Sequence, residues 1–391
     1  MNYNILPIQE THVDDCVTIW ANAYPAAGMP LESIKERMID SLKNDETVHL
    51  FGAFADDNLL AIMRLHDFTM NWHGQWVRCG GIGGVAVSLL HKKERICKQM
   101  IEFFVDYYRK QDVSILSLYP FRPDFYYQMG FGYGAQRFQY KVPPQAFPNF
   151  HEKSHLVYLQ KDDIPLLVDC FDKYAANHHG VFKKHDKPFA GFFRSPVPRV
   201  VGYMKDGELL GYMFIAFKKM HESNFVLHDM HVFEWICNDV NAWREFSTFL
   251  HSQADQVNPI VMDTFDAEFY HLLADVRNGS GNLIPSVYHE SNSAGVGLMY
   301  KIVDPEKFFQ AIGQRQFSGK NRSWNFFIED SFGEDLAFRL SVLDGKIRYE
   351  KWEDSSSKSQ NIATVRMDIA TFSSWVMGAL SFESAYQYQM A

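Results

Sequence analysis

The feature that most constrains the fold of this 391-residue chain is an internal repeat. Two apolar runs joined at Asp56-Asp57-Asn58 predict a β-hairpin over Leu50 to Phe68. The segment RVVGYMKDGELLGYMF, from Arg199 to Phe214, repeats this hairpin about 150 residues later, with Gly202 answering Gly52. In both copies a strand-like segment and an amphipathic helix follow, at Val85 to Phe104 and at Val232 to Leu250. Short hairpins also recur by chance in unrelated sheets, but the shared order of elements favours two related α/β units in tandem.

The pattern changes after Asn292. Asp304-Pro305-Glu306 predicts a helix start, with Asp as the cap and Pro at the first position. A meander of three strands is expected at Trp324 to Asp330, Leu336 to Val342 and Lys346 to Trp352. A Ser-rich loop follows at Glu353 to Asn361, and then a last strand, IATVRMDI, and a last helix at Thr371 to Leu380. We therefore predict three domains, at residues 1–145, 146–290 and 291–391, the first two α/β and the third α+β.

Composition excludes several classes of protein. A net charge of −9 argues against a phosphate-tracking nucleic-acid binder and is compatible with cationic substrates. Five scattered cysteines suggest neither a disulfide framework nor a zinc site, so no metal is expected. The start of the chain lacks the pattern of a signal peptide, and no apolar run approaches the roughly 18 residues that span a bilayer. A cytoplasmic protein without a membrane span is the expectation.

A donor-binding pattern begins inside the first repeat, in GGIGGVAVSLLHKKERICKQM at Gly80 to Met100. A Gly-rich entry, a β-branched strand, a basic turn and an amphipathic helix follow one another there. Because a helix N-terminus offers unpaired N–H groups, the basic residues His91, Lys92 and Lys93 beside it suit a pyrophosphate. A short basic turn taken alone is also typical of a solvated helix start.

A second motif follows about twenty residues later, where the strand SILSLYPF precedes DFYYQMGFGYG. With this order the chain resembles the GNAT N-acetyltransferase superfamily over roughly its first 145 residues. The segment on which this resemblance rests is FYYQMGF, at Phe125 to Phe131. The whole chain, including GLMYKIVDPEKFF at Gly297 to Phe309, resembles the Eis (enhanced intracellular survival) family. The fold implied is two tandem GNAT-like mixed-sheet units followed by an α+β domain like sterol carrier protein type 2.

The resemblance implies how acetyl-coenzyme A would bind. The strand at Val85, Ala86 and Val87 would offer backbone groups to the pantetheine arm, and the following turn would hold the pyrophosphate. That turn comprises His91, Lys92, Lys93, Arg95 and Ile96. The backbone N–H of Val87 would stabilise the oxyanion that forms when an amine attacks the acetyl carbonyl.

The resemblance also implies two catalytic groups. Tyr126 aligns with the tyrosine that protonates the departing coenzyme A thiolate, a role that suits a phenol because it is neutral at pH 7. The carboxylate of the last residue, Ala391, would accept the proton of the amine. The alternative interpretation is that Tyr126 is an aromatic residue of the core and that Ala391 belongs to a frayed terminus.

The chain departs from the family pattern at the pyrophosphate turn. Arg95 stands where a glycine is expected, and Glu94 adds a repelling charge. The second repeat has EWICNDVNAW at this point, without a basic turn, so we predict no cofactor site there.

The expected function is transfer of acetyl from acetyl-coenzyme A to a primary amine of a cationic small molecule, or of lysine, by direct attack without a covalent enzyme intermediate. The resemblance suggests aminoglycoside-like, polyamine-like or lysine-type acceptors and a homo-oligomer, which is often a hexamer in that family. The alternative is a catalytically degenerate member that binds an apolar or acyl ligand, or another protein, through its C-terminal domain.

Overall fold

The computed structural model describes residues 3–193, 199–220, 223, 225–352 and 362–391. The Ser-rich loop expected at Glu353 to Asn361 lies outside the described residues. The chain forms two compact units, one from Met1–Gly134 with Gly297–Ala391 (unit 1) and one from Ala135–Val296 (unit 2). The three domains expected from the sequence remain a prediction, which these two compact units do not test. None of the helices in the described part of the chain has the length and apolar character required to cross a bilayer.

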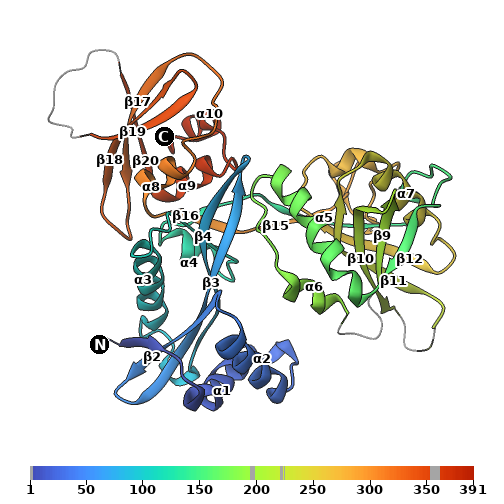
Figure 1. The fold of residues 1–391 in the computed structure, drawn as a ribbon, viewed down its shortest axis with the longest axis horizontal. Helices are drawn as coiled ribbons and strands as arrows, with labels where there is room; N and C mark the ends of the chain where they lie inside the picture. Colours follow the sequence, from blue (N-terminus) through green and yellow to red (C-terminus); the bar gives the residue numbers. More distant parts are fainter. Residues whose placement is uncertain (1–2, 194–198, 221–222, 224, 353–361) are drawn as a thin grey trace. The chain divides into compact units, whose positions relative to one another are not determined.

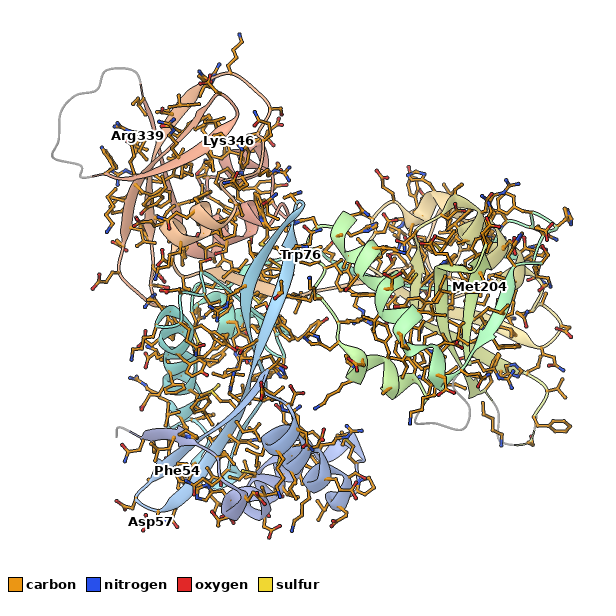
Figure 2. All side chains as sticks on the ribbon, in the orientation of Figure 1. Phe54, Asp57, Trp76, Met204, Arg339 and Lys346 are labelled. Carbon is orange, nitrogen blue, oxygen red and sulfur yellow. The ribbon has the colours of Figure 1, made fainter. Side chains whose placement is uncertain are left out.

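Unit 1 contains a seven-stranded sheet in the order β1-β2-β3-β4-β5-β16-β6. Its strands are β1 (Asn4–Pro7), β2 (Val48–Ala55), β3 (Asn58–Trp72), β4 (Gln75–Val87), β5 (Ile115–Leu118), β16 (Met299–Ile302) and β6 (Gly132–Tyr133). All neighbours are antiparallel except β4 and β5. The β2–β3 hairpin confirms the prediction, and Asp56 takes the positive φ of 50° that its tight turn needs. Figure 2 shows Phe54 and Asp57 at its tip.

Helices cover both faces of this sheet (Figure 1). They are α1 (Val13–Ala23), α2 (Leu31–Asn44), α3 (Ile96–Arg109) and α4 (Pro123–Tyr127). The helices α1 and α2 bury their apolar sides with β3 and β4 around Ile62 and Ala86. On the opposite face α3 buries Met100, Phe104 and Tyr108. The periodicity that predicted an amphipathic helix within Val85 to Phe104 is thus the periodicity of the residues that α3 buries.

Unit 2 repeats this topology. Its sheet has the order β8-β9-β10-β11-β12-β7-β15, with β11 and β12 parallel. Its strands are β8 (Leu156–Leu159), β9 (Arg199–Lys205), β10 (Glu208–Lys219), β11 (His228–Cys237), β12 (Val257–Thr264), β7 (Arg137–Val142) and β15 (Ser293–Gly295). Its helices are α5 (Ile164–Asn177), α6 (Asp186–Phe192) and α7 (Val240–His251), and a two-stranded ribbon pairs β13 (Leu283–Ile284) with β14 (Tyr288–His289). The repeat extends to the helix entries, where Gln9 and Gln160 each form a capping box.

In each sheet the sixth strand comes from the part of the chain that directly follows the other repeat. In unit 1, β16 lies between β5 and β6, although about 165 residues separate it from β6. In unit 2, β7 lies between β12 and β15 and precedes the rest of that sheet in the chain. The two repeats have therefore exchanged one strand each.

The C-terminal part of unit 1 adds a four-stranded sheet in the order β19-β18-β17-β20. These strands are β19 (Lys346–Lys351), β18 (Leu336–Leu343), β17 (Arg322–Glu329) and β20 (Ala363–Asp368), and the helices are α8 (Pro305–Ala311), α9 (Ile369–Val376) and α10 (Phe382–Gln387). The predicted cap of α8 is confirmed, because the Asp304 side chain accepts a hydrogen bond from the Lys307 amide at 3.0 Å.

Hydrogen bonds join this C-terminal part to the seven-stranded sheet. Trp72 Nε1 donates to Val376 O at 3.1 Å, and Ile302 N donates to Ser373 Oγ at 3.0 Å. At the centre Lys301 on β16 is fully buried, with Nζ 2.7 and 2.9 Å from the two Asp330 oxygens and 3.2 Å from Met129 O. Met129 follows the FYYQ segment directly, so the C-terminal part holds the turn after Tyr126.

Candidate active site

The candidate site begins where β4 parts from β5. The two strands pair from Cys79 with Ile115 to Ile82 with Leu118, and there β5 ends. A bulge follows in β4, with Gly84 at φ 59°, a conformation that favours glycine. From Gly83 to Val87, β4 pairs with β3 alone. Unit 1 therefore has an open strand edge at the segment that the sequence analysis assigned to the donor.

The ladder fixes which backbone groups face this opening. Ser88 N donates to Leu60 O at 2.8 Å, which makes Ser88 and Leu60 a hydrogen-bonded pair. Because such pairs alternate along antiparallel strands, Ala86 bonds to β3 whereas the N–H and C=O of Val87 point away from it. Ala86 turns its side chain into the α1–α2 layer, and Val85 and Val87 pack on the α3 side. The Val87 N–H is thus aimed into the gap.

Tyr126 lies in the core on the same side of the sheet, at 3 % exposure. Pro123 occupies the first turn of α4, and Phe131 N returns to Tyr126 O at 3.1 Å, which fixes the segment. The Tyr126 hydroxyl makes no hydrogen bond within the described residues. Burial raises the pKa of this phenol, and the neighbouring Cys97 and Tyr24 raise it further. Tyr126 therefore stays protonated at neutral pH and is free to donate.

Two neighbours of Tyr126 were not predicted as site residues. Tyr24, just after α1, donates from its hydroxyl to Val85 O at 2.6 Å, which ties α1 to the open edge of β4. Cys97, in the first turn of α3, has its pKa raised to about 11 by burial. In the sequence Tyr24 marks only the apolar side of a helix, and only the fold brings both residues to the splayed strand.

The predicted pyrophosphate turn retains a glycine-like backbone without glycine. Lys93 and Arg95 adopt φ values of 69° and 61°, and Arg95 is the residue that precedes α3. The left-handed conformation that a family glycine would supply is therefore present at Arg95, at a cost of about 1 kcal/mol or more. The side chains of Lys92, Lys93 and Arg95 are exposed, and buried Ile96 begins the helix.

The carboxylate of the acidic residue in this turn, Glu94, is hydrogen-bonded to neighbouring side chains. Glu94 accepts hydrogen bonds from the Tyr3 hydroxyl at 3.0 Å and from the His91 ring at 3.2 Å. These bonds, Tyr3 first, lower the pKa of Glu94. His91 is therefore engaged with Glu94, while Lys92, Lys93 and Arg95 remain as the cations of the turn.

The chain end is placed away from Tyr126. After α10, Met390 N donates to Ala385 O at 2.8 Å, so the tail folds back on its own helix. Figure 1 shows the C-terminus beside α10 and the four-stranded sheet, apart from α4. The structure thus brings together Val85, Ala86, Val87 and Tyr126, followed by the turn from His91 to Ile96, but does not bring Ala391 to them.

On the opposite face of the splayed strand, residues of α1, α2 and β2–β4 line a small, partly open cleft. Its lining is apolar apart from Arg64 on β3, and Gly84 lies at its edge. His66, two residues along β3, stacks on Phe68 with ring centroids 5.4 Å apart. Burial, followed by the charge of Arg64, lowers the pKa of His66 to about 4, so this imidazole is neutral at pH 7. Sequence reasoning missed both residues because a strand pattern gives no sign of which positions face a cleft.

Unit 2 has the same parting of strands, but an indole fills it. The β11–β12 pairing ends at Val232 with Met262, and the register of β10 and β11 makes Trp235 the counterpart of Val85. Its ring contacts Phe147, Phe246 and Phe269 at centroid distances of 6.2, 6.3 and 6.3 Å. Asp239 caps α7 by accepting from Asn241 N at 2.6 Å, which places an acid where a phosphate would need a cation. This packing supports the prediction that unit 2 lacks a cofactor site.

One group of potential metal ligands occurs among the described residues. Ligand atoms of Glu152, His155 and Glu245 lie within 4.8 Å of one another in unit 2. Protein hydrogen bonds already use the group, since His155 Nδ1 lies 2.6 Å from Glu245 Oε1 and Glu152 accepts from Ser154 N at 2.8 Å. We assign it no metal.

Comparison with known proteins agrees with this geometry. Residues 4–134 match the family described as acetyltransferase (GNAT) domain, so the chain contains a GNAT acetyltransferase domain that spans the open strand, the turn and Tyr126. No curated protein matches the chain significantly.

Solved structures extend the likeness to the entire fold. A GCN5-related N-acetyltransferase from Anabaena variabilis is 15 % identical with a TM-score of 0.81, covering 100 % of this chain and 93 % of its own. A probable N-acyltransferase of Enterococcus faecalis is 18 % identical with a TM-score of 0.80 and the same coverage. Eis1 from Mycobacterium abscessus is 16 % identical with a TM-score of 0.71, again with that coverage. At these identities the likeness shows a shared fold.

Proposed function

We propose that this protein is an acetyl-coenzyme-A-dependent N-acetyltransferase acting on a primary amine of a small molecule, in line with the sequence analysis. The observation that carries the proposal is the open edge of β4 from Gly83 to Val87, with an unbonded, protonated Tyr126 hydroxyl in the adjoining core. An open strand edge offers amide-pairing positions, and the pantetheine arm carries amides that can fill them.

The residues present fit the donor along its length. Val85 and Val87 would pair with pantetheine, and the α3 N-terminus with Lys92, Lys93 and Arg95 would hold the pyrophosphate. The left-handed backbone at Lys93 and Arg95 supports this role, because it keeps the turn concave at the helix start. The pairing of Glu94 with Tyr3 and His91 turns its carboxylate to protein donors.

The proposed reaction is direct. The neutral amine attacks the thioester carbonyl, the new C–N bond forms, and the Val87 N–H stabilises the oxyanion. The C–S bond then breaks and Tyr126 gives its proton to the leaving sulfur, which yields free coenzyme A. The Ala391 carboxylate remains our proposed acceptor of the amine proton, a role that requires the tail to leave the end of α10.

The alternative function is less well supported. In the C-terminal part the space between the sheet and its helices is occupied by aromatic rings. Phe338 lies 5.4 Å from Phe326, 5.8 Å from Phe372 and 6.5 Å from Phe309, ring centroid to ring centroid. Such packing argues against an apolar ligand there. The likeness of residues 291–391 to sterol carrier protein type 2, a homo-oligomeric state and a cytoplasmic location remain proposals.

The test begins with calorimetry of the full chain against acetyl-coenzyme A. We expect saturable binding below millimolar concentration, followed by thiol release when primary amines are added. Absence of binding at millimolar ligand would refute the proposal. Trp235→Ala serves as a matched control, since it alters the equivalent position of unit 2 and should leave donor binding unchanged.

A further inference from the structure

The cleft on the α1–α2 face contains a guanidinium without a protein partner. Arg64 forms no hydrogen bond or ion pair with any described residue, and its Nε is buried from solvent. A guanidinium carries five donors and stays charged in proteins. Because a buried donor left unsatisfied is costly, an unpartnered arginine in a cleft needs an explanation.

Neighbouring groups leave this site positive. Burial lowers the pKa of Arg64, and the charge of Arg37 on α2 lowers it further, with Asp45 acting in the opposite sense. The nearby His66 is neutral at pH 7. Arg64 is the one charged residue among the described residues that line the cleft. A fully cationic acceptor would be repelled at this point.

Arg64 is also close to the proposed point of acyl transfer. It pairs with Gly83 across the ladder, just before the bulge that opens β4. A Cβ added at Gly84 would meet no atom within 4 Å, so the strand is bare beside the arginine. Gly83 and Val87 are four residues apart, or about 13 Å along the strand. The arginine side chain and an extended acceptor must together span this separation to bring the amine to Val87.

We infer that the acceptor is a primary amine that carries a carboxylate, which Arg64 binds through paired N–H donors while the amine is acetylated. The inference rests on the proposed function and selects lysine-type acceptors over polyamines and aminoglycosides. Planar, bidentate recognition is the geometry in which arginine and carboxylate match. The carboxylate is bound and not consumed.

The test compares acceptors that differ only in this group. The pairs are L-lysine with L-lysinamide and 6-aminohexanoate with 6-aminohexanamide, with thiol release from acetyl-coenzyme A as the readout. Wild type should prefer each acid over its amide by about 10- to 100-fold in kcat/KM. Arg64→Gln should reduce that preference to about threefold or less, and Arg64→Lys should fall between.

Arg37→Gln is the matched control. It removes a positive charge next to Arg64 from an exposed arginine whose Nη1 contacts Met29 Sδ at 3.8 Å, so the preference should persist. Arg64→Met should keep or raise the urea midpoint, since it replaces an unpaired charge, whereas a structural role for Arg64 predicts a fall.

Two outcomes overturn the inference: equal turnover of acid and amide by wild type, or a preference that survives in Arg64→Gln. If no amine is turned over, calorimetry of the same pairs decides. Tighter binding of the acids that depends on Arg64 supports the carboxylate site even though the proposed function fails, and equal binding of acid and amide refutes it.

Discussion

Replacing either member of the Lys301–Asp330 pair should destabilise unit 1 more than any surface substitution. Both side chains are buried, and Lys301 Nζ also donates to Met129 O. Lys301→Met leaves the Asp330 carboxylate with the Phe332 amide, at 3.0 Å, as its remaining close donor, and Asp330→Asn leaves an ammonium without its counter-ion. Breaking a buried pair in this way costs about 3–5 kcal/mol.

The measurement is urea unfolding followed by fluorescence, with a double-mutant cycle. Because each single variant leaves one uncompensated charge, the double variant Lys301→Met/Asp330→Asn should cost less than the sum of the singles by about 2 kcal/mol or more. Lys307→Met is the control, since Lys307 forms an exposed ion pair with Asp112 and should lose less than about 1 kcal/mol. Additive single costs, or costs below about 1 kcal/mol, would refute the reasoning.

Three further predictions concern the candidate site. Tyr126→Phe should reduce turnover by about 100-fold or more while leaving acetyl-coenzyme A affinity within about twofold by calorimetry; unchanged turnover would remove Tyr126 from the mechanism. Arg95→Gly should raise the free energy of unfolding by about 1 kcal/mol, since glycine adopts φ 61° without strain, and Arg95→Ala should give no such gain in the same melt. Because burial raises the pKa of Cys97 to about 11, its alkylation by iodoacetamide, followed by mass spectrometry, should be slow at pH 8 and accelerate about tenfold per pH unit below pH 11; a plateau near pH 9 would contradict the burial.

Local patterns predicted the local elements. The Asp56 turn and the Asp304 cap each depend on neighbours in the sequence, and the structure confirms them. The place of β16 in the first sheet could not be predicted in this way, because about 180 residues separate its four residues from their partners in β5. Short apolar strands do not specify a distant partner.

The candidate site, too, could be predicted only where a local motif records it. The order of strand, turn, helix and FYYQMGF in the sequence predicted that the strand of Val85 and Val87 lies in one site with Tyr126, and these residues pack in the same core. Tyr24, Cys97 and Arg64 come to the site through packing of α1, α3 and β3, which no motif records. Arg95 was predicted as a departure from glycine, and the structure shows that the backbone conformation survived the change of side chain.

The exchanged strands have a consequence for synthesis of the chain. After Leu118 emerges from the ribosome, roughly 180 residues must follow before Met299 can pair with it, which takes about 9 to 36 seconds at typical rates of elongation. Throughout that interval the β5 edge is uncovered and can template pairing with another nascent chain. A fragment that stops at residue 145 would keep this edge permanently exposed. A recombinant form of the first domain should therefore include Gly297–Ala391, because those residues belong to the same compact unit as Met1–Gly134.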